Sequence, residues 1–291
     1  MPRANWIENP GGDFLANCPH CGSGNAGDGA YCTNCGHALE TAALPTPAAA
    51  ASRPLSTRDR TVVLLHLALL LAILLGFSYI GSGGQHRVVE RFGRPTFYAA
   101  TIVWEWVLLA YVWVGMRRQR LTLAEITGGR WKTPEDVLLD LAVAGGFWIC
   151  AAVVLGVVGY ALGLAGQAQQ ADTLKKVGFL APANLQEIAI WLGLSATAGF
   201  CEEIIFRGYL QRQFIALSRS SVIGILLSAA VFGASHGYEG PARMVQIGIF
   251  GLMFGILAHF RKSLRPGMIA HAWHDSFSGI LLYILGRAMK P

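Results

Sequence analysis

The chain has 291 residues, of which 53% are apolar and only 14% are charged. Because an ordinary soluble domain carries about a quarter charged residues, this composition argues against a water-soluble globular protein. The formal net charge of +6 does not indicate a nucleic-acid partner, since most lysines and arginines lie in short segments between apolar runs. Basic residues in such segments set the orientation of membrane helices. We therefore expect a membrane protein in contact with lipids.

Two Cys-x-x-Cys pairs stand near the N-terminus, Cys18 with Cys21 and Cys32 with Cys35. Paired motifs of this kind place four thiolates around one structural Zn²⁺; a pair of disulfides is the alternative. We expect residues 1–40 to form a zinc ribbon, which could bind a protein partner. Residues 41–60 are rich in alanine and proline without hydrophobic periodicity, which predicts a linker.

From residue 61 to residue 291 the sequence predicts an all-α, polytopic transmembrane helix bundle. Long stretches without Lys, Arg, Asp or Glu match the thickness of a bilayer, which takes about 20 residues of helix. We expect about seven membrane helices, with six or eight as alternatives. Their approximate ranges are 61–80, 97–116, 137–163, 185–217, 222–236, 245–260 and 267–285.

The distribution of basic residues predicts the orientation of this bundle. Under the seven-helix reading, more Lys and Arg flank the side that carries the N-terminus than the opposite side. Loops rich in Lys and Arg stay in the cytoplasm. We expect a multi-pass protein of the plasma membrane with a cytoplasmic ribbon, because cysteines stay reduced in the cytoplasm and can bind zinc there.

The fourth apolar segment contains three charged residues, Glu202, Glu203 and Arg207. A charge within a membrane helix costs at least about 2.5 to 3.5 kcal/mol, so it needs a partner or a function. On an α-helix Glu203 and Arg207 share one face and can form an ion pair. Glu202 points about 100° away from its neighbour, so it remains as a carboxylate available for acid or base chemistry.

Two later segments carry histidines that could join these carboxylates. His236 ends the fifth segment, and His271 and Asp275 lie four residues apart near the start of the seventh. That spacing lets two side chains hold one metal, or lets a carboxylate orient an imidazole. If Ser221 and Pro266 lie at the same membrane surface, His236 is about 22 Å deep and His271 only about 8 Å, at 1.5 Å per residue. Tilt, a helix break or a re-entrant turn must close that gap.

Glu105 and Asp140 also lie in or beside apolar segments, but they match no motif. We expect both carboxylates to form bonds between helices.

Residues 183–283 resemble the CPBP family, which comprises CAAX prenyl proteases and bacteriocin-processing intramembrane endopeptidases. The resemblance rests on an EExxxR motif at Glu202, Glu203 and Arg207, an FxxxH motif ending at His236, and His271 followed by Asp275. The three motifs occur in the family's order within apolar segments.

The resemblance implies a role for each motif residue. Glu202 would activate water, Glu203 and Arg207 would position it, and His236 would contact the water or a metal. His271 and Asp275 would bind a catalytic divalent metal such as Zn²⁺, together with His236, or stabilise the oxyanion. Many family members have Asn in place of Asp275. Because an ionised Asp only accepts hydrogen bonds, Asp275 is either a metal ligand or protonated.

The predicted function is hydrolysis of a peptide bond in a prenylated or otherwise membrane-anchored substrate by a CAAX-type intramembrane metalloendopeptidase. The alternative is a catalytically inactive scaffold or immunity protein of the same fold. A proton-coupled transporter would also place charged residues in membrane helices, but the sequence lacks the paired halves common in that class.

A fragment of residues 1–45 is expected to bind one Zn²⁺ and to unfold when a chelator removes it, because so small a module lacks a sufficient apolar core. Metal content and circular dichroism of the fragment, with and without chelator, test this prediction. A fragment that folds equally well without zinc would contradict the predicted zinc ribbon.

Overall fold

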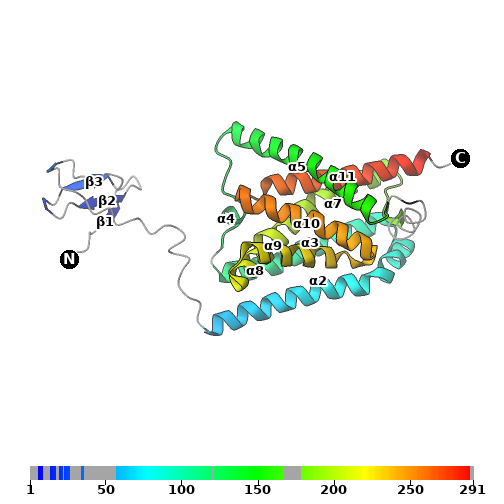
Figure 1. Cartoon of the computed structure of the whole chain (residues 1–291), viewed down its shortest axis with the longest axis horizontal. Helices are drawn as coiled ribbons and strands as arrows, with labels where there is room; N and C mark the ends of the chain where they lie inside the picture. The colour runs from blue at the N-terminus through cyan, green and yellow to red at the C-terminus, as the bar shows by residue number, and fades with distance from the viewer. Residues whose placement is uncertain are drawn as a thin grey trace. The chain divides into compact units, whose positions relative to one another are not determined.

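A computed structural model describes residues 6–8, 14–17, 20, 21, 23–26, 34, 35, 57–119, 121–164, 166 and 178–288. The chain divides into two compact units, Met1–Ser56 and Thr57–Pro291. Each unit is described by itself (Figure 1).

The first unit contains a small antiparallel sheet in the order β1-β2-β3, formed by Trp6–Glu8, Phe14–Asn17 and Gly24–Ala26. Cys21 lies between β2 and β3, and the Asn34 side-chain amide contacts its sulfur at 3.8 Å and donates to Ser23 Oγ at 2.9 Å. The segment with Asn34 and Cys35 therefore lies beside the turn with Cys21. Cys18 and Cys32 are outside the described residues, so the zinc ribbon stays a prediction.

The described part of the second unit is helical. Its elements are α2 (Thr57–Phe92), α3 (Arg94–Arg118), α4 (Leu123–Thr127), α5 (Pro134–Ala161), η1 (Gly178–Leu180), α7 (Leu185–Glu202), η2 (Glu203–Leu210), α8 (Gln211–Ser218), α9 (Ser221–Ser235), η3 (Gly237–Glu239), α10 (Pro241–Arg261) and α11 (Arg265–Ala288). η1 and η3 are short 3₁₀ helices, and η2 is a π-helix continuous with α7 and α8.

A helix covers each of the seven segments expected from hydrophobicity, although α2 continues to Phe92, well past the expected end at residue 80. Five described helical stretches are long and apolar enough to cross a membrane, and α9 is shorter at 15 residues. The expected class, a polytopic helical membrane protein, is therefore confirmed. The exact number of crossings stays a prediction.

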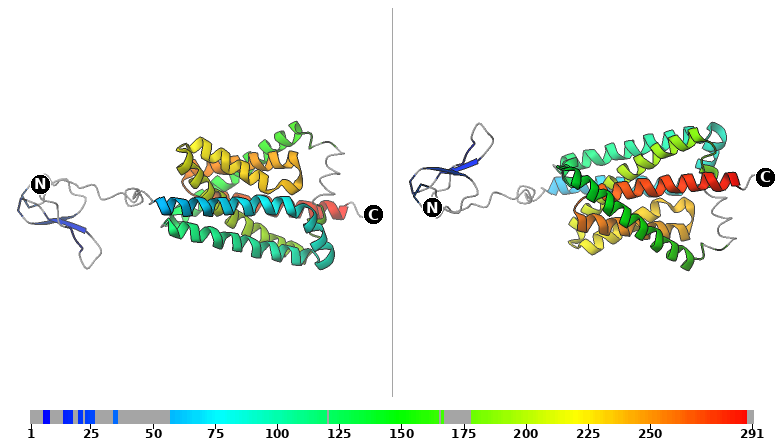
Figure 2. Two further views of the ribbon diagram at one scale, coloured as in Figure 1. Left: turned by 90° about the horizontal axis from the view of Figure 1, so that it is seen from below. Right: turned by 90° about the horizontal axis from the view of Figure 1, so that it is seen from above.

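The helix α7 lies between α3 and α11, and α11 also packs against α5 (Figure 2, right). On the other side of the unit α9 packs against α10 and α8. All eight residues of η2 are buried, including Glu203 and Arg207. The segment that carries the charged motif is therefore the centre of the bundle.

Two glycines allow close approach of helix backbones around this centre. A Cβ on Gly199 of α7 would lie 2.7 Å from the Met268 carbonyl oxygen of α11, and one on Gly233 of α9 would lie 2.5 Å from the Met244 carbonyl oxygen of α10. Small residues at such contacts are typical of membrane helix packing. The first contact joins two helices that carry expected site residues, and the second joins α10 to α9, which ends beside His236.

Asp140 joins three helices at one end of the bundle. Its carboxylate is 1% exposed and lies 3.0 Å from Arg261 of α10 and 2.9 Å from Arg265 of α11. The Trp131 indole nitrogen donates to it at 2.8 Å. The expected role of Asp140 in bonding between helices therefore agrees with its contacts.

Replacing Asp140 with Asn is expected to lower the free energy of unfolding by about 2 to 4 kcal/mol, because two arginines lose a buried counter-charge but keep some access to solvent. Thermal unfolding of the full chain in detergent measures the change. Glu135→Gln, at an exposed position of the same helix, is the matched control and should unfold like wild type. Equal stability of the wild type and both variants would contradict a stabilising role of Asp140.

Candidate functional site

The expected site residues gather around a cavity of about 340 Å³ inside the helical unit. Glu202 reaches it from α7, His236 from the end of α9, and His271 and Asp275 from α11. Glu203 and Arg207 lie behind this wall and are not part of the cavity lining. Thus four of the six expected catalytic residues line one cavity, and the other two support it.

Glu203 and Arg207 form a buried ion pair within η2. The Glu203 Oε1 and Arg207 Nη1 atoms are 2.9 Å apart, and each side chain is 1% exposed. The sequence predicted this pair on an α-helix, whereas the structure holds it in a π-helix. Such wide turns are rare and often occur at functional sites.

The Arg207 guanidinium also contacts α9 and α10. Nη2 donates to the Gly251 carbonyl oxygen at 2.9 Å, and Cζ lies 4.4 Å from the Phe232 ring centre and 5.0 Å from that of Phe254. Aromatic faces attract a desolvated cation. Arg207 therefore connects the EExxxR motif to Phe232, the first residue of the FxxxH motif.

His271 links the ion pair to the cavity. Its Nδ1 lies 3.3 Å from Glu203 Oε1, and its Nε2 lies 3.7 Å from both Glu202 Oε2 and Asp275 Oδ2. An ionised carboxylate only accepts, so Nδ1–H donates to Glu203 and the orientation of the ring is fixed. Nε2 consequently faces Glu202 and Asp275, at distances longer than a direct hydrogen bond.

His236 is oriented by its own helix. Its Nδ1 lies 2.9 Å from the Phe232 carbonyl oxygen, which can only accept a hydrogen bond. The proton of the neutral imidazole is therefore on Nδ1, and Nε2 has a free lone pair. Because His236 lines the cavity, this lone pair is an acceptor within the candidate site.

The cavity brings together two histidines that the sequence places at different depths. Both His236 and His271 line it, although His236 follows the end of α9 and His271 lies in the first two turns of α11. The turn before α11 packs against η2, since a Cβ on Gly208 would be 3.2 Å from the Leu264 side chain, and Ser263 and Leu264 are buried. The means by which the expected gap is closed, whether tilt, a helix break or a re-entrant turn, stays a prediction.

Glu105 is a member of the cavity lining that sequence reasoning assigned elsewhere. It reaches the cavity from α3, is 8% exposed, and its Oε2 is buried without a hydrogen-bond partner among the described residues. The expected bond between helices is therefore contradicted for Glu105. Its position in an apolar run was the available signal, but no motif connected it to the other residues.

The described residues do not assemble a metal site of three or more His, Cys, Asp or Glu ligands. The expected set of His236, His271 and Asp275 does not form such a group among the described residues, although His271 Nε2 and Asp275 Oδ2 are 3.7 Å apart. The donor set therefore does not fit a three-ligand centre as arranged.

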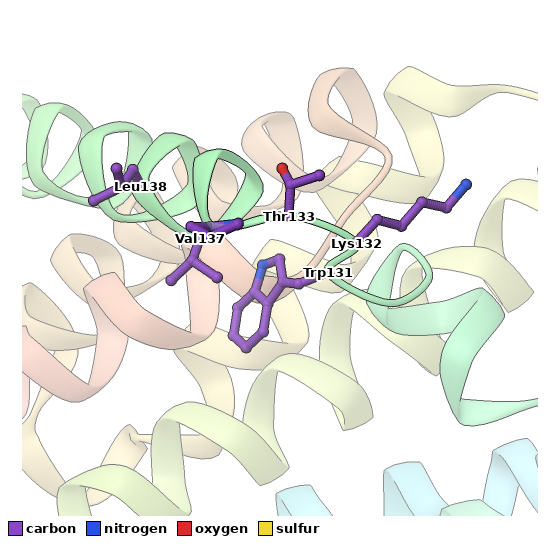
Figure 3. A pocket seen from close by; sticks show the side chains of 6 residues that line it. Trp131, Lys132, Thr133, Val137 and Leu138 are labelled. Carbon is purple, nitrogen blue, oxygen red and sulfur yellow. The ribbon is translucent and has the colours of Figure 1, made fainter.

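A second, more open hollow of about 540 Å³ lies at the start of α5 (Figure 3). Trp131, Lys132, Thr133, Pro134, Val137 and Leu138 line it. Among the described lining residues Lys132 is the ionisable one, and this set includes none of the expected site residues. We therefore place the candidate site in the smaller cavity.

The fold and the cavity define a helical membrane protein with carboxylates and imidazoles gathered at its centre. Residues 184–277 match the family described as type II CAAX prenyl endopeptidase Rce1-like. No curated protein and no solved structure matches the chain. The matched segment contains all six expected catalytic residues and carries a domain of a protease family, so the protease resemblance is supported there.

Removing Glu203 alone is expected to destabilise the protein by about 3 to 5 kcal/mol, because Arg207 then becomes an unpaired buried charge. We expect Glu203→Leu to show this loss in thermal unfolding. The double variant Glu203→Leu with Arg207→Leu should recover much of the stability while its activity stays low, since His271 has lost its acceptor. A double variant as unstable as the single one would contradict the pairing.

Proposed function

We propose that the protein is an intramembrane endopeptidase that cuts a prenylated or otherwise membrane-anchored peptide. The observation that carries the proposal is the placement of His271, which Glu203 orients so that Nε2 faces Glu202 across 3.7 Å of the cavity. The family match over residues 184–277 supports the same reaction class. It does not favour the inactive scaffold or immunity protein.

In the proposed reaction a water molecule in the cavity lies beside Glu202 and His271 Nε2 and contacts both. Glu202 removes a proton from this water while the water oxygen attacks the scissile carbonyl carbon. The tetrahedral intermediate collapses with cleavage of the C–N bond, and Glu202 returns the proton to the leaving amine. His236, His271 and His274 line the cavity. In protonated form His236 or His271 can donate to the carbonyl oxygen.

A catalytic metal, expected from the resemblance, is not needed for these steps. No step of the proposed reaction passes through a metal, because the three expected ligands do not form a metal-binding group among the described residues. Asp275 then acts on His271 Nε2, from which its Oδ2 is 3.7 Å away. In this role it favours the protonated imidazole at the stage where negative charge develops on the substrate oxygen.

For the first unit we propose a zinc ribbon on the cytoplasmic side that recognises a protein partner. The contact of Asn34 with Cys21 supports a shared site, since it brings the two Cys-x-x-Cys motifs together. The surplus of basic residues on the N-terminal side of the bundle supports the cytoplasmic orientation.

Replacing Glu202 with Gln is expected to reduce the rate of cleavage by about 10²- to 10⁴-fold without loss of folding, because the amide keeps the volume but lacks the basic lone pair. The measurement is cleavage of a library of lipid-anchored peptides by the full chain in proteoliposomes. Glu90→Gln, at an exposed position of α2, is the control and should cleave like wild type. Full activity of a stably folded Glu202→Gln protein would refute this mechanism and leave the scaffold reading ahead.

A further inference from the structure

Glu105 is a buried carboxylate that the proposed reaction does not use. It lies on α3, outside the matched segment of residues 184–277, yet its side chain lines the same cavity as Glu202, His271 and Asp275. It also interacts electrostatically with those three residues. Its location therefore adds α3 to the walls of the site, beside α7, α9, α10 and α11.

The carboxylate of Glu105 has no hydrogen bond to any residue that the structure describes, and its Oε2 is fully buried. Burying a carboxylate without a donor costs free energy, and that cost is recovered only when a donor arrives. Asp140 shows the contrast, because two arginines and a tryptophan surround its equally apolar position. Glu105 offers carboxylate oxygens as acceptors, as Asp140 does, but no described residue donates a hydrogen bond to them.

The charge of the cavity indicates which donor fits. Four carboxylates, from Glu105, Glu202, Glu239 and Asp275, line it. Among the described lining residues the one lysine or arginine is Arg243, whose Nη1 already donates to Gln246 at 2.7 Å. A cationic group entering the cavity therefore meets more acceptors than competing cations, whereas a free carboxylate meets like charges.

We propose that Glu105 binds a lysine or arginine side chain of the substrate and makes the protein selective for peptides with a basic residue beside the scissile bond. This inference rests on the proposed function for the bond that is cut, but the binding step can be measured separately. The cavity, at about 340 Å³, has several times the volume of one water molecule and can admit such a side chain. Glu105 lies on a rigid helix, so the bound group would be held near Glu202.

The test uses the full chain in lipid nanodiscs and three lipid-anchored peptide libraries that differ only in a fixed Lys, norleucine or Glu. The fixed residue is scanned through the positions around the cut, and every peptide ends in an amide. We expect wild type to prefer Lys over norleucine by about 10-fold or more in kcat/KM, the effect of one charge-assisted hydrogen bond. Glu105→Gln should reduce that preference to within about 3-fold, because kcat/KM falls more for Lys peptides than for norleucine peptides.

Two controls separate a specificity role from other roles of the carboxylate. Glu105→Asp keeps the charge and should keep part of the preference for Lys, and Glu90→Gln should keep all of it. Glu105→Gln should also be at least as stable as wild type, because it removes an unpartnered buried charge. If Glu105→Gln slows Lys and norleucine peptides equally, Glu105 acts on the chemistry rather than on selection, and the proposal is wrong.

Binding of the same peptides, followed by fluorescence anisotropy, distinguishes failure of this inference from failure of the proposed function. Tighter binding of Lys peptides that depends on Glu105, without cleavage of any peptide, would keep the inference and overturn the protease. Cleavage by wild type with no preference for Lys would keep the protease and overturn the inference. Absence of both Lys-selective binding and Lys-selective cleavage would also overturn it.

Discussion

The structure depends on one buried ion pair, Glu203 with Arg207, at the centre of an apolar bundle. Neither group can be solvated there, since each side chain is 1% exposed. The requirement to satisfy both groups determines which elements surround them. Arg207 takes a carbonyl oxygen from α10 and aromatic faces from α9 and α10, and Glu203 takes the imidazole of His271 from α11. The arrangement that neutralises two charges is thus also the arrangement that aims His271 at the cavity.

Such a pair is weak as a source of stability, because desolvation offsets much of the attraction between its charges. Its stronger effect is on specificity of packing: any register of α11 that removes His271 from Glu203 leaves the buried Nδ1–H donor of His271 without its acceptor in a low dielectric medium. Gly199 favours the same register, because it lets the backbones of α7 and α11 approach closely. A side chain at this position would meet the α11 backbone. Electrostatics and steric fit therefore select one position of α11 against α7.

Much of this was predictable from the sequence, since long apolar runs fix the positions of helices and charges inside them stand out. The pairing of Glu203 with Arg207 follows from their spacing, and the approach of His271 follows from the motif order. The π-helix was not predictable, because α and π turns have similar composition. The packing of the turn at Leu264 against Gly208 was not predictable either, because the two residues are far apart in the sequence. Glu105 and Asp140 look alike as isolated acids in the sequence; only the neighbouring helices decide that one finds two arginines and the other finds none.

The direction in which the cavity extends has a consequence for cell compartments. Its lining reaches Leu180 of η1, Tyr238 of η3 and Leu282 near the end of α11. These elements lie toward the end of the bundle where α2 finishes, since η1 is bonded to the start of α3 through Tyr98 and Arg94. Peptides that reach Glu202 through this lining come from the compartment facing that end. For the proposed protease, mapping which membrane face holds Phe92 therefore also identifies the compartment nearest to these lining residues.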